Sequence, residues 1–174
     1  MPNQIIDKLA YFDYNINIQV VLGGKMRICT FMGQSIDGNQ DKYIAEILRI
    51  LETEIGDEEA EILIGGIEGM VPTAILCCNI YKRSHPNIKT VLVLSANDFP
   101  DFYKKLFDTT LYFSVEDETP ESAVIYRNNY MVDLCNVFIT NFHEINDYMF
   151  RLYKHANNTE KAVYNLYDIQ KLPH

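Results

Sequence analysis

The sequence predicts an α/β fold in which helices cover both faces of a mainly parallel sheet of about five strands. Short apolar runs such as Glu61–Ile64 and Ile88–Leu94 alternate with longer segments of helical periodicity. Strands with apolar residues on both sides are typical of a central parallel sheet, which helices bury on both faces. A glycine-rich turn, Gly65–Gly69, follows one apolar run and precedes a predicted helix. Together these features predict a three-layer domain.

The predicted elements follow from hydrophobic periodicity and from turn residues. The strands are expected at Met26–Met32, Glu61–Ile64, Ile88–Leu94, Thr110–Val115, Asn136–Thr140 and Ala162–Leu166. The helices are expected at Lys42–Glu54, Val71–Cys78, Pro100–Phe107, Thr119–Leu134 and Ile145–Ala156. Thr119-Pro120-Glu121 is typical of a helix start, because it supplies a capping hydroxyl, a proline and a first-turn carboxylate.

The N-terminal segment, residues 1–25, fits this pattern poorly, whereas residues 26–174 form one predicted domain. Asn15–Leu22 alternates like a strand and is followed by Gly23-Gly24. Two interpretations stay open. Either Met26 is the natural start and the preceding residues are an extension, or the segment adds an edge strand or an oligomer contact.

Composition limits the function classes. The chain has 174 residues, 48% of them hydrophobic, and a net charge of −9 with no basic cluster to offset it. A nucleic-acid partner is therefore not expected, because such binding requires phosphates to be neutralised. No segment is long and apolar enough to suggest a membrane partner, and no signal-peptide pattern opens the chain. We expect a cytoplasmic protein.

The four cysteines lie in apolar segments and match no zinc-binding spacing. They are Cys29, Cys77, Cys78 and Cys135. We expect buried, reduced thiols, and we predict no metal site and no cofactor.

The predicted binding residues follow the first two strands. They are Gly33, Gln34, Gly65, Gly66 and Gly69. Ligands of parallel α/β sheets bind at the carboxyl ends of the strands, where glycines allow close approach and the next helix directs its positive end. This pattern favours a phosphate or nucleotide site, although a tight strand-to-helix turn has the same sequence features.

Arg127 lies on an otherwise apolar stripe of a predicted helix, where a charge requires a partner. The functional hypothesis is that Arg127 binds a phosphate or carboxylate ligand, with Asn128 bonding the same ligand. The alternative is a structural ion pair with Asp133 or Glu68.

Four segments carry a resemblance to a known family. They are Cys29–Gln34, Gly65–Met70, His85–Lys89 and Arg127–Asp133. In order and spacing they resemble the SLOG superfamily, the Rossmann-like group that includes DNA-processing protein A and the lysine-decarboxylase-like phosphoribohydrolases. The chain looks most similar to the small, uncharacterised YpsA-like bacterial branch. The resemblance implies a Rossmann-like domain that binds a nucleotide or nucleotide derivative.

The chain departs from the family pattern at three places. Gln34-Ser35 replaces a His-Arg pair, Val71 replaces an acidic residue, and Asn141–Asn146 replaces a Gly-Gly-Thr phosphate loop. These changes remove part of the family's phosphate cradle and its phosphoribohydrolase signature.

Three function hypotheses result. The first is a binding module for a small phosphorylated or nucleotide-like ligand. The second is an enzyme that cleaves an N-glycosidic bond in a nucleotide, with Glu68 as acid or base. The third is a degenerate, non-catalytic interaction protein. Frequent tyrosine and phenylalanine also favour a homo-oligomer contact.

Overall fold

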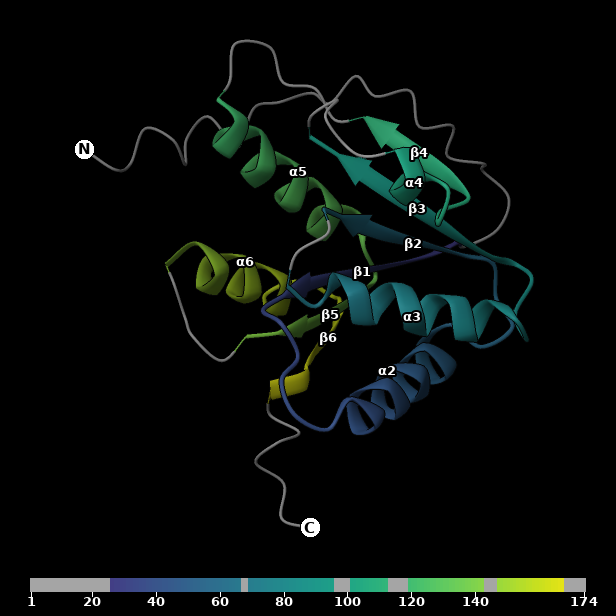
Figure 1. Ribbon diagram of the computed structural model, residues 1–174. Helices are drawn as coiled ribbons and strands as arrows, with labels where there is room; N and C mark the ends of the chain where they lie inside the picture. Colours follow the sequence, from purple (N-terminus) through teal and green to yellow (C-terminus); the bar gives the residue numbers. More distant parts are fainter. Residues whose placement is uncertain (1–25, 67–68, 96–100, 113–118, 143–146, 168–174) are drawn as a thin grey trace.

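The described residues form a central sheet of six strands. They are β1 (Arg27–Gly33), β2 (Ala60–Gly65), β3 (Ile88–Leu94), β4 (Thr109–Tyr112), β5 (Val137–Asn141) and β6 (Ala162–Asn165). All neighbouring strands are parallel, in the order β4-β3-β2-β1-β5-β6 (Figure 1). The structure is a computed structural model, and it describes residues 26–66, 69–95, 101–112, 119–142 and 147–167.

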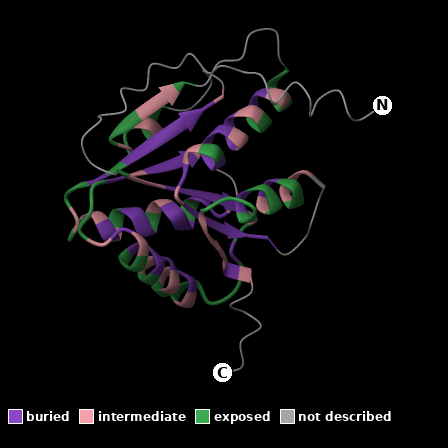
Figure 2. Ribbon diagram, turned by 180° about the vertical axis from the view of Figure 1, so that it is seen from behind, coloured by how far each residue is buried: buried purple, intermediate pink, exposed green. Residues whose placement is uncertain are grey.

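Helices cover both faces of the sheet. They are α2 (Gln40–Glu54), α3 (Val71–Lys82), α4 (Asp101–Lys104), α5 (Pro120–Leu134) and α6 (Asp147–Asn157). Helices α2 and α3 pack on one face, while α5 and α6 pack on the other (Figure 1). Figure 2 shows the result, with mostly buried central strands between helices that keep exposed outer surfaces. Apolar side chains on both sides of each central strand therefore supply two hydrophobic cores.

The predicted fold class is confirmed as a three-layer, Rossmann-like α/β domain. The described sheet has six strands where about five were expected, and it is wholly parallel. The short strand β4 pairs with β3 at one edge, with Val91 opposite Thr109. The predicted strand at Asn15–Leu22 lies outside the described residues, so the interpretation of residues 1–25 stays a prediction.

The sheet changes direction of growth between β1 and β5. The chain builds outward from β1 to β4, then crosses to the other side of β1 for β5 and β6. In register, Phe31 lies opposite Ile139 and Gly33 opposite Asn141. The ends of β1 and β5 therefore meet at the switch point, where parallel α/β folds bind ligands.

Helix α5 begins as predicted at the Thr119-Pro120-Glu121 sequence. The Thr119 hydroxyl accepts a hydrogen bond from the Ser122 backbone N–H at 3.2 Å, and Pro120 occupies the first turn. This cap satisfies one of the N–H groups that lack a partner inside the helix. It also fixes where α5 starts, and hence which residues of α5 face the sheet.

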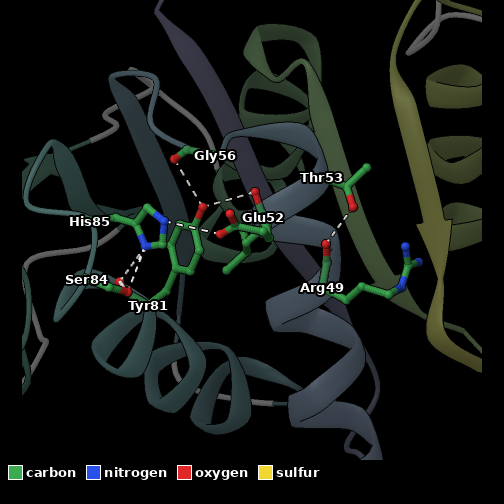
Figure 3. Close-up of polar contacts among 8 residues, drawn as sticks. Arg49, Glu52, Thr53, Gly56, Tyr81, Ser84 and His85 are labelled. Atoms are coloured by element: carbon green, nitrogen blue, oxygen red, sulfur yellow. Dashed lines mark hydrogen bonds and ion pairs between the residues drawn. The ribbon is translucent and has the colours of Figure 1, made fainter.

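The carboxyl-terminal ends of α2 and α3 are joined by a polar cluster on Tyr81 and His85 (Figure 3). The Tyr81 hydroxyl lies 3.2 Å from the Gly56 carbonyl oxygen, and its ring stacks on His85 with centroids 3.8 Å apart. His85 Nε2 lies 3.2 Å from a Glu52 carboxylate oxygen. Burial, followed by the nearby Glu52, raises the pKa of Tyr81 to about 12. The cluster therefore holds Tyr81 as a neutral donor and ties the two helices together.

Asp108 connects β4 to the rest of the sheet. Its carboxylate accepts hydrogen bonds from the Thr90 backbone N–H at 2.7 Å and the Thr90 hydroxyl at 2.9 Å, and it pairs with Lys82. Burial acts to raise the pKa of Asp108, but the hydrogen bonds from Lys82 and Thr90 outweigh it and lower the pKa.

We expect Asp108→Asn to reduce the free energy of unfolding at pH 7 by about 1 kcal/mol. Because the folded pKa of Asp108 lies below its unfolded value of about 3.9, its stabilisation is present above pH 4. That stabilisation is lost as the pH falls through the folded pKa. Urea unfolding at several pH values should therefore show the variant and wild type converging in acid. A constant difference from pH 7 to pH 2 would contradict this account.

The four cysteines are free and buried, which confirms the expectation for these side chains. Burial raises the pKa of Cys77 and of Cys135 to about 12, so these thiols stay protonated at neutral pH. No helix in the described part of the chain has the length and apolar character needed to cross a membrane.

Candidate functional site

The predicted glycines lie at one edge of the sheet, where β1 and β2 end. Gly33 is the last residue of β1 and Gly65 the last residue of β2, while Gly66 and Gly69 belong to the turn before α3. Gln34 follows Gly33, and its backbone N–H donates to the Asn141 carbonyl at 2.8 Å. The structure thus brings the predicted loop residues together at the switch-point edge.

Gly33 and Gly69 serve close backbone packing. A Cβ atom on Gly69, which has φ +63°, would lie 2.0 Å from the Gly33 carbonyl oxygen. A Cβ on Gly33 would lie 2.5 Å from the Asn141 backbone nitrogen. The Met70 N–H donates to the Gly33 carbonyl at 3.2 Å. These two glycines therefore seat the β2–α3 turn on the end of β1, which is a structural role that their positions alone explain.

Gly65 makes room for Arg127. The side chain of Arg127 reaches from α5 across the end of β2, and a Cβ on Gly65 would lie 2.9 Å from Arg127 Nε and 2.9 Å from Met131 Sδ. At Gly66, which has φ +85°, a Cβ would lie 3.8 Å from Arg127 Nη1. The guanidinium thus lies directly over the Gly65-Gly66 turn, at the edge where the glycines of both loops meet.

Arg127 is buried, with 8% of its surface exposed, and its nearest polar partner is a neutral amide. Asn128 Oδ1 accepts hydrogen bonds from Arg127 Nε at 3.1 Å and Nη2 at 2.9 Å. Among the described residues, no carboxylate forms an ion pair with this guanidinium. An arginine side chain has five N–H groups. Two of them donate to Asn128, and the other three have no acceptor among the described residues.

Asp133 was one predicted ion-pair partner for Arg127, and this alternative is wrong. Asp133 is exposed and lies 2.7 Å from His155 Nε2, on the α5–α6 side of the molecule. The spacing of six residues along α5 explains the error, because it places Asp133 about 120° around the helix from Arg127. The other predicted partner, Glu68, lies outside the described residues.

Tyr148 of helix α6 lies near Arg127 and Asn128. Asn128 is 8% exposed. Burial raises the pKa of Tyr148 to about 12, while the Asn128 hydrogen bond and the Arg127 charge act in the opposite direction. Burial also lowers the pKa of Arg127 from its ordinary value, with Tyr148 opposing that shift. Arginine nevertheless stays protonated in proteins, so this edge carries a buried positive charge.

The end of β5 contributes a second polar position. Asn141 is 2% exposed and donates from Nδ2 to the Gln34 and Ser35 carbonyls, both at 3.1 Å. Its Oδ1 and the hydroxyl of Thr140 are buried and have no hydrogen-bond partner within the described residues. Buried acceptors of this kind usually have a partner. Within the described part of the chain, this edge therefore holds a buried acceptor without a partner as well as guanidinium N–H groups without one.

Sequence reasoning missed two residues of this arrangement, Tyr148 and Asn141. Tyr148 comes from α6 and lies near Arg127 only through helix packing, so no local pattern could have identified it. Asn141 could have been found, because an amide at the end of a fully buried strand lies at the switch-point edge. The sequence comparison with the SLOG pattern identified Asn141–Asn146 as the segment in place of the phosphate loop, but it assigned Asn141 itself no role.

A mainly apolar hollow lies against α6. It is lined by Phe142, Met149, Phe150, Tyr153 and Asn165. None of the predicted binding residues lines it. Within the described residues, no three His, Cys, Asp or Glu side chains are grouped so that they could hold a metal ion.

Comparisons with known proteins support the fold. No protein-family model and no curated protein matches the chain. Among solved structures, the chain is similar to the X-ray structure of DNA processing protein A from Streptococcus pneumoniae, with a TM-score of 0.55 and 18% sequence identity. The similarity covers 80% of this chain and 50% of that protein, so the chain spans about half of its length. With a TM-score of 0.55 and identity of 18%, the similarity shows a shared Rossmann-like fold and nothing beyond the fold.

Proposed function

We propose that this protein binds a nucleotide or nucleotide derivative, with Arg127 as the contact for an anionic group of the ligand. The observation that supports the proposal is a buried guanidinium whose partner is an amide and which has three N–H groups without an acceptor among the described residues. An uncompensated buried charge is costly. A phosphate or carboxylate on these N–H groups would compensate it, because guanidinium binds such oxygens in a bidentate manner.

The end of α3 favours the same location. Met70 is the N-cap of α3 and makes no side-chain capping bond, and Pro72 occupies the first turn. The positive end of the helix dipole therefore lies beside Gly69, at the edge where Arg127 sits. Two independent sources of positive potential, a helix end and a guanidinium, thus act on one region of the sheet.

The same proposal includes a family assignment. We propose that the chain belongs to the SLOG superfamily and to its YpsA-like branch. Support comes from the order of the four sequence segments and from the fold likeness to DNA processing protein A. The net charge of −9 argues against DNA as a ligand here, so the proposal is limited to small ligands. A cytoplasmic location and homo-oligomer formation stay predictions.

Thermal unfolding with a ligand panel tests the proposed function. We expect AMP, ADP, ATP or pyrophosphate to raise the melting temperature by about 5–10 °C at roughly 100 times Kd. Adenosine, which lacks phosphate, should give a much smaller shift. Arg127→Gln should remove the phosphate-dependent shift, since it removes the charge.

Arg49→Gln is the matched control, because Arg49 is exposed on α2 and pairs with Glu46. It should leave the shift unchanged. An equal shift in Arg127→Gln and wild type would overturn the assigned contact, and no shift with any phosphate compound would overturn the function. Release of free base from a nucleotide would instead support the N-glycosidic hydrolase hypothesis.

A further inference from the structure

Three hydrogen bonds tie the loop after β1 to the end of β5. Asn141 Nδ2 donates to the carbonyl oxygens of Gln34 and Ser35, both at 3.1 Å, and the Gln34 N–H donates to the Asn141 carbonyl at 2.8 Å. Because both loop acceptors are carbonyls, only the NH2 side of the Asn141 amide can face them. Its Oδ1 atom is therefore turned away from the loop, and it is buried without a hydrogen-bond partner among the described residues.

The Asn141 amide fixes the orientation of two successive peptide groups. No cis peptide bond occurs in the described part of the chain, and in a planar trans peptide the N–H points opposite to the C=O. The Gln34 and Ser35 carbonyls point toward Asn141. The N–H groups of the same two peptide units belong to Ser35 and Ile36, so these two backbone donors point away from Asn141 and from β5.

These two backbone donors have no acceptor within the described ranges. Neither the Ser35 N–H nor the Ile36 N–H donates to a described residue, whereas the Gln34 N–H does. Ser35 is exposed, while the Ile36 side chain is buried in the core and anchors the loop. Successive N–H groups that point the same way form an anion-binding concavity, which is called a nest. The Ser35 and Ile36 N–H groups therefore have the arrangement of a nest.

The start of α3 lies close to this nest. The Met70 N–H, at the N-cap of α3, donates to the carbonyl of Gly33, which precedes Ser35 by two residues. The positive end of the helix dipole thus favours an anion at the same loop. Asp37 follows the nest directly, but it is exposed, so water and salt screen its charge.

We propose that the Ser35 and Ile36 N–H groups bind a phosphate group of the ligand, and that Asn141 is the positioning residue that directs them. The inference deepens the proposed function and rests on it, because it adds a second contact for the phosphates of the ligand that Arg127 receives. Donors that Asn141 orients in advance reduce the ordering cost of binding. An amide performs this role without adding a negative charge beside the phosphate.

The test is a titration of the ¹⁵N-labelled full chain with pyrophosphate. The backbone amide resonances of Ser35 and Ile36 should shift progressively to saturation. The Asn141 side-chain NH2 resonances should shift with them, because they bond to the same peptide units. Asn141→Ala should weaken pyrophosphate binding about tenfold, since it releases both peptide groups.

Asn165→Ala is the matched control. Asn165 also ends a strand, β6, and its side chain also bonds to the backbone of a neighbouring strand end, at Phe142. It should leave the pyrophosphate affinity and the Ser35 and Ile36 shifts unchanged. If Asn141→Ala lowers the melting temperature but keeps the wild-type affinity, the positioning role is overturned. Should Asn141→Ala fail to fold, stationary Asn141 NH2 resonances in the wild-type titration would overturn that role.

The resonances that shift separate this inference from the proposed function. A shift of Arg127 Nε–H without shifts at Ser35 and Ile36 would overturn the nest and leave the proposed function standing. Shifts at Ser35 and Ile36 without one at Arg127 would support the nest and overturn the Arg127 contact. No shift at any of the three residues would overturn both.

Discussion

Gly69→Ala is expected to lower the free energy of unfolding by roughly 2–5 kcal/mol. The new methyl group would lie 2.0 Å from the Gly33 carbonyl oxygen, at a residue with φ +63°. The nearest atoms all belong to the backbone of Gly33 and Gln34, so they cannot turn aside as the end of a flexible side chain would. Relief requires the β2–α3 turn to separate from the end of β1, which breaks the Met70-to-Gly33 hydrogen bond. Urea unfolding followed by circular dichroism measures the loss.

Gly38→Ala is the matched control for Gly69→Ala. Gly38 also has a positive φ, +98°, but a Cβ built there has no atom within 4 Å among the described residues. Gly38→Ala should therefore lower the free energy of unfolding only by the strain of a left-handed backbone, about 1–2 kcal/mol. Equal losses in the two variants would mean that strain alone explains Gly69 and that the turn does not need its close contact with β1.

Asn128→Asp is expected to abolish anion binding while the fold is kept or stabilised. A carboxylate oxygen in the place of Oδ1 would lie about 3 Å from Arg127 Nε and Nη2 and form an ion pair in which this one oxygen accepts from both nitrogens. The new pair would neutralise the buried guanidinium and repel a ligand anion. We expect the affinity for a phosphate ligand to fall by at least about 10- to 100-fold.

Asn129→Asp is the control for Asn128→Asp, because it adds the same charge to the next residue of α5, about 100° around the helix. It should change affinity only slightly, as a screened charge at a distance does. Calorimetric titration gives the affinity and thermal unfolding gives the stability. Retained affinity in Asn128→Asp would contradict the role of an uncompensated charge, and a large loss of stability would contradict the predicted ion pair.

The layered fold could be predicted because its elements are coded locally. Runs such as Ile88–Leu94 are apolar on both sides, and the helix start at Thr119-Pro120 has a capping hydroxyl in the expected place. Alternation of such strands and helices leaves few arrangements besides a parallel sheet. The strand expected at Thr110–Val115 is β4, but its place in the sheet was less predictable, because β4 has four described residues and Asp108 joins it to β3.

The candidate site was only partly predictable, for a different reason. The glycine pattern at Gly65-Gly66 correctly located the turn, but the reason for Gly65 is the Arg127 side chain from a helix some sixty positions later. The partner of Arg127 was sought among acids, since charges are usually paired. Among the described residues, the partner is the Asn128 amide, while Glu68 lies outside them. Contacts between distant elements, such as Arg127 with Gly65, leave no periodic signal in the sequence.

The glycine turns also change how the edge should be understood. Gly33 and Gly69 are explained by backbone packing, so they are not evidence for a ligand by themselves. What distinguishes this edge from an ordinary strand-to-helix turn is the charge beside it and the Asn141 Oδ1 atom, which has no hydrogen-bond partner among the described residues. The binding proposal therefore depends on Arg127 more than on the glycines.

The Arg127 Nε–H resonance is the most direct test of this account. Titration of ¹⁵N-labelled protein with AMP or pyrophosphate should shift that resonance progressively to saturation. The resonances of Arg49 and Arg151, which lie on exposed helix surfaces, should stay in place. A saturating shift at Arg127 would establish the guanidinium as the anion contact. An unchanged Arg127 resonance, while the protein binds the ligand elsewhere or not at all, would contradict the central claim.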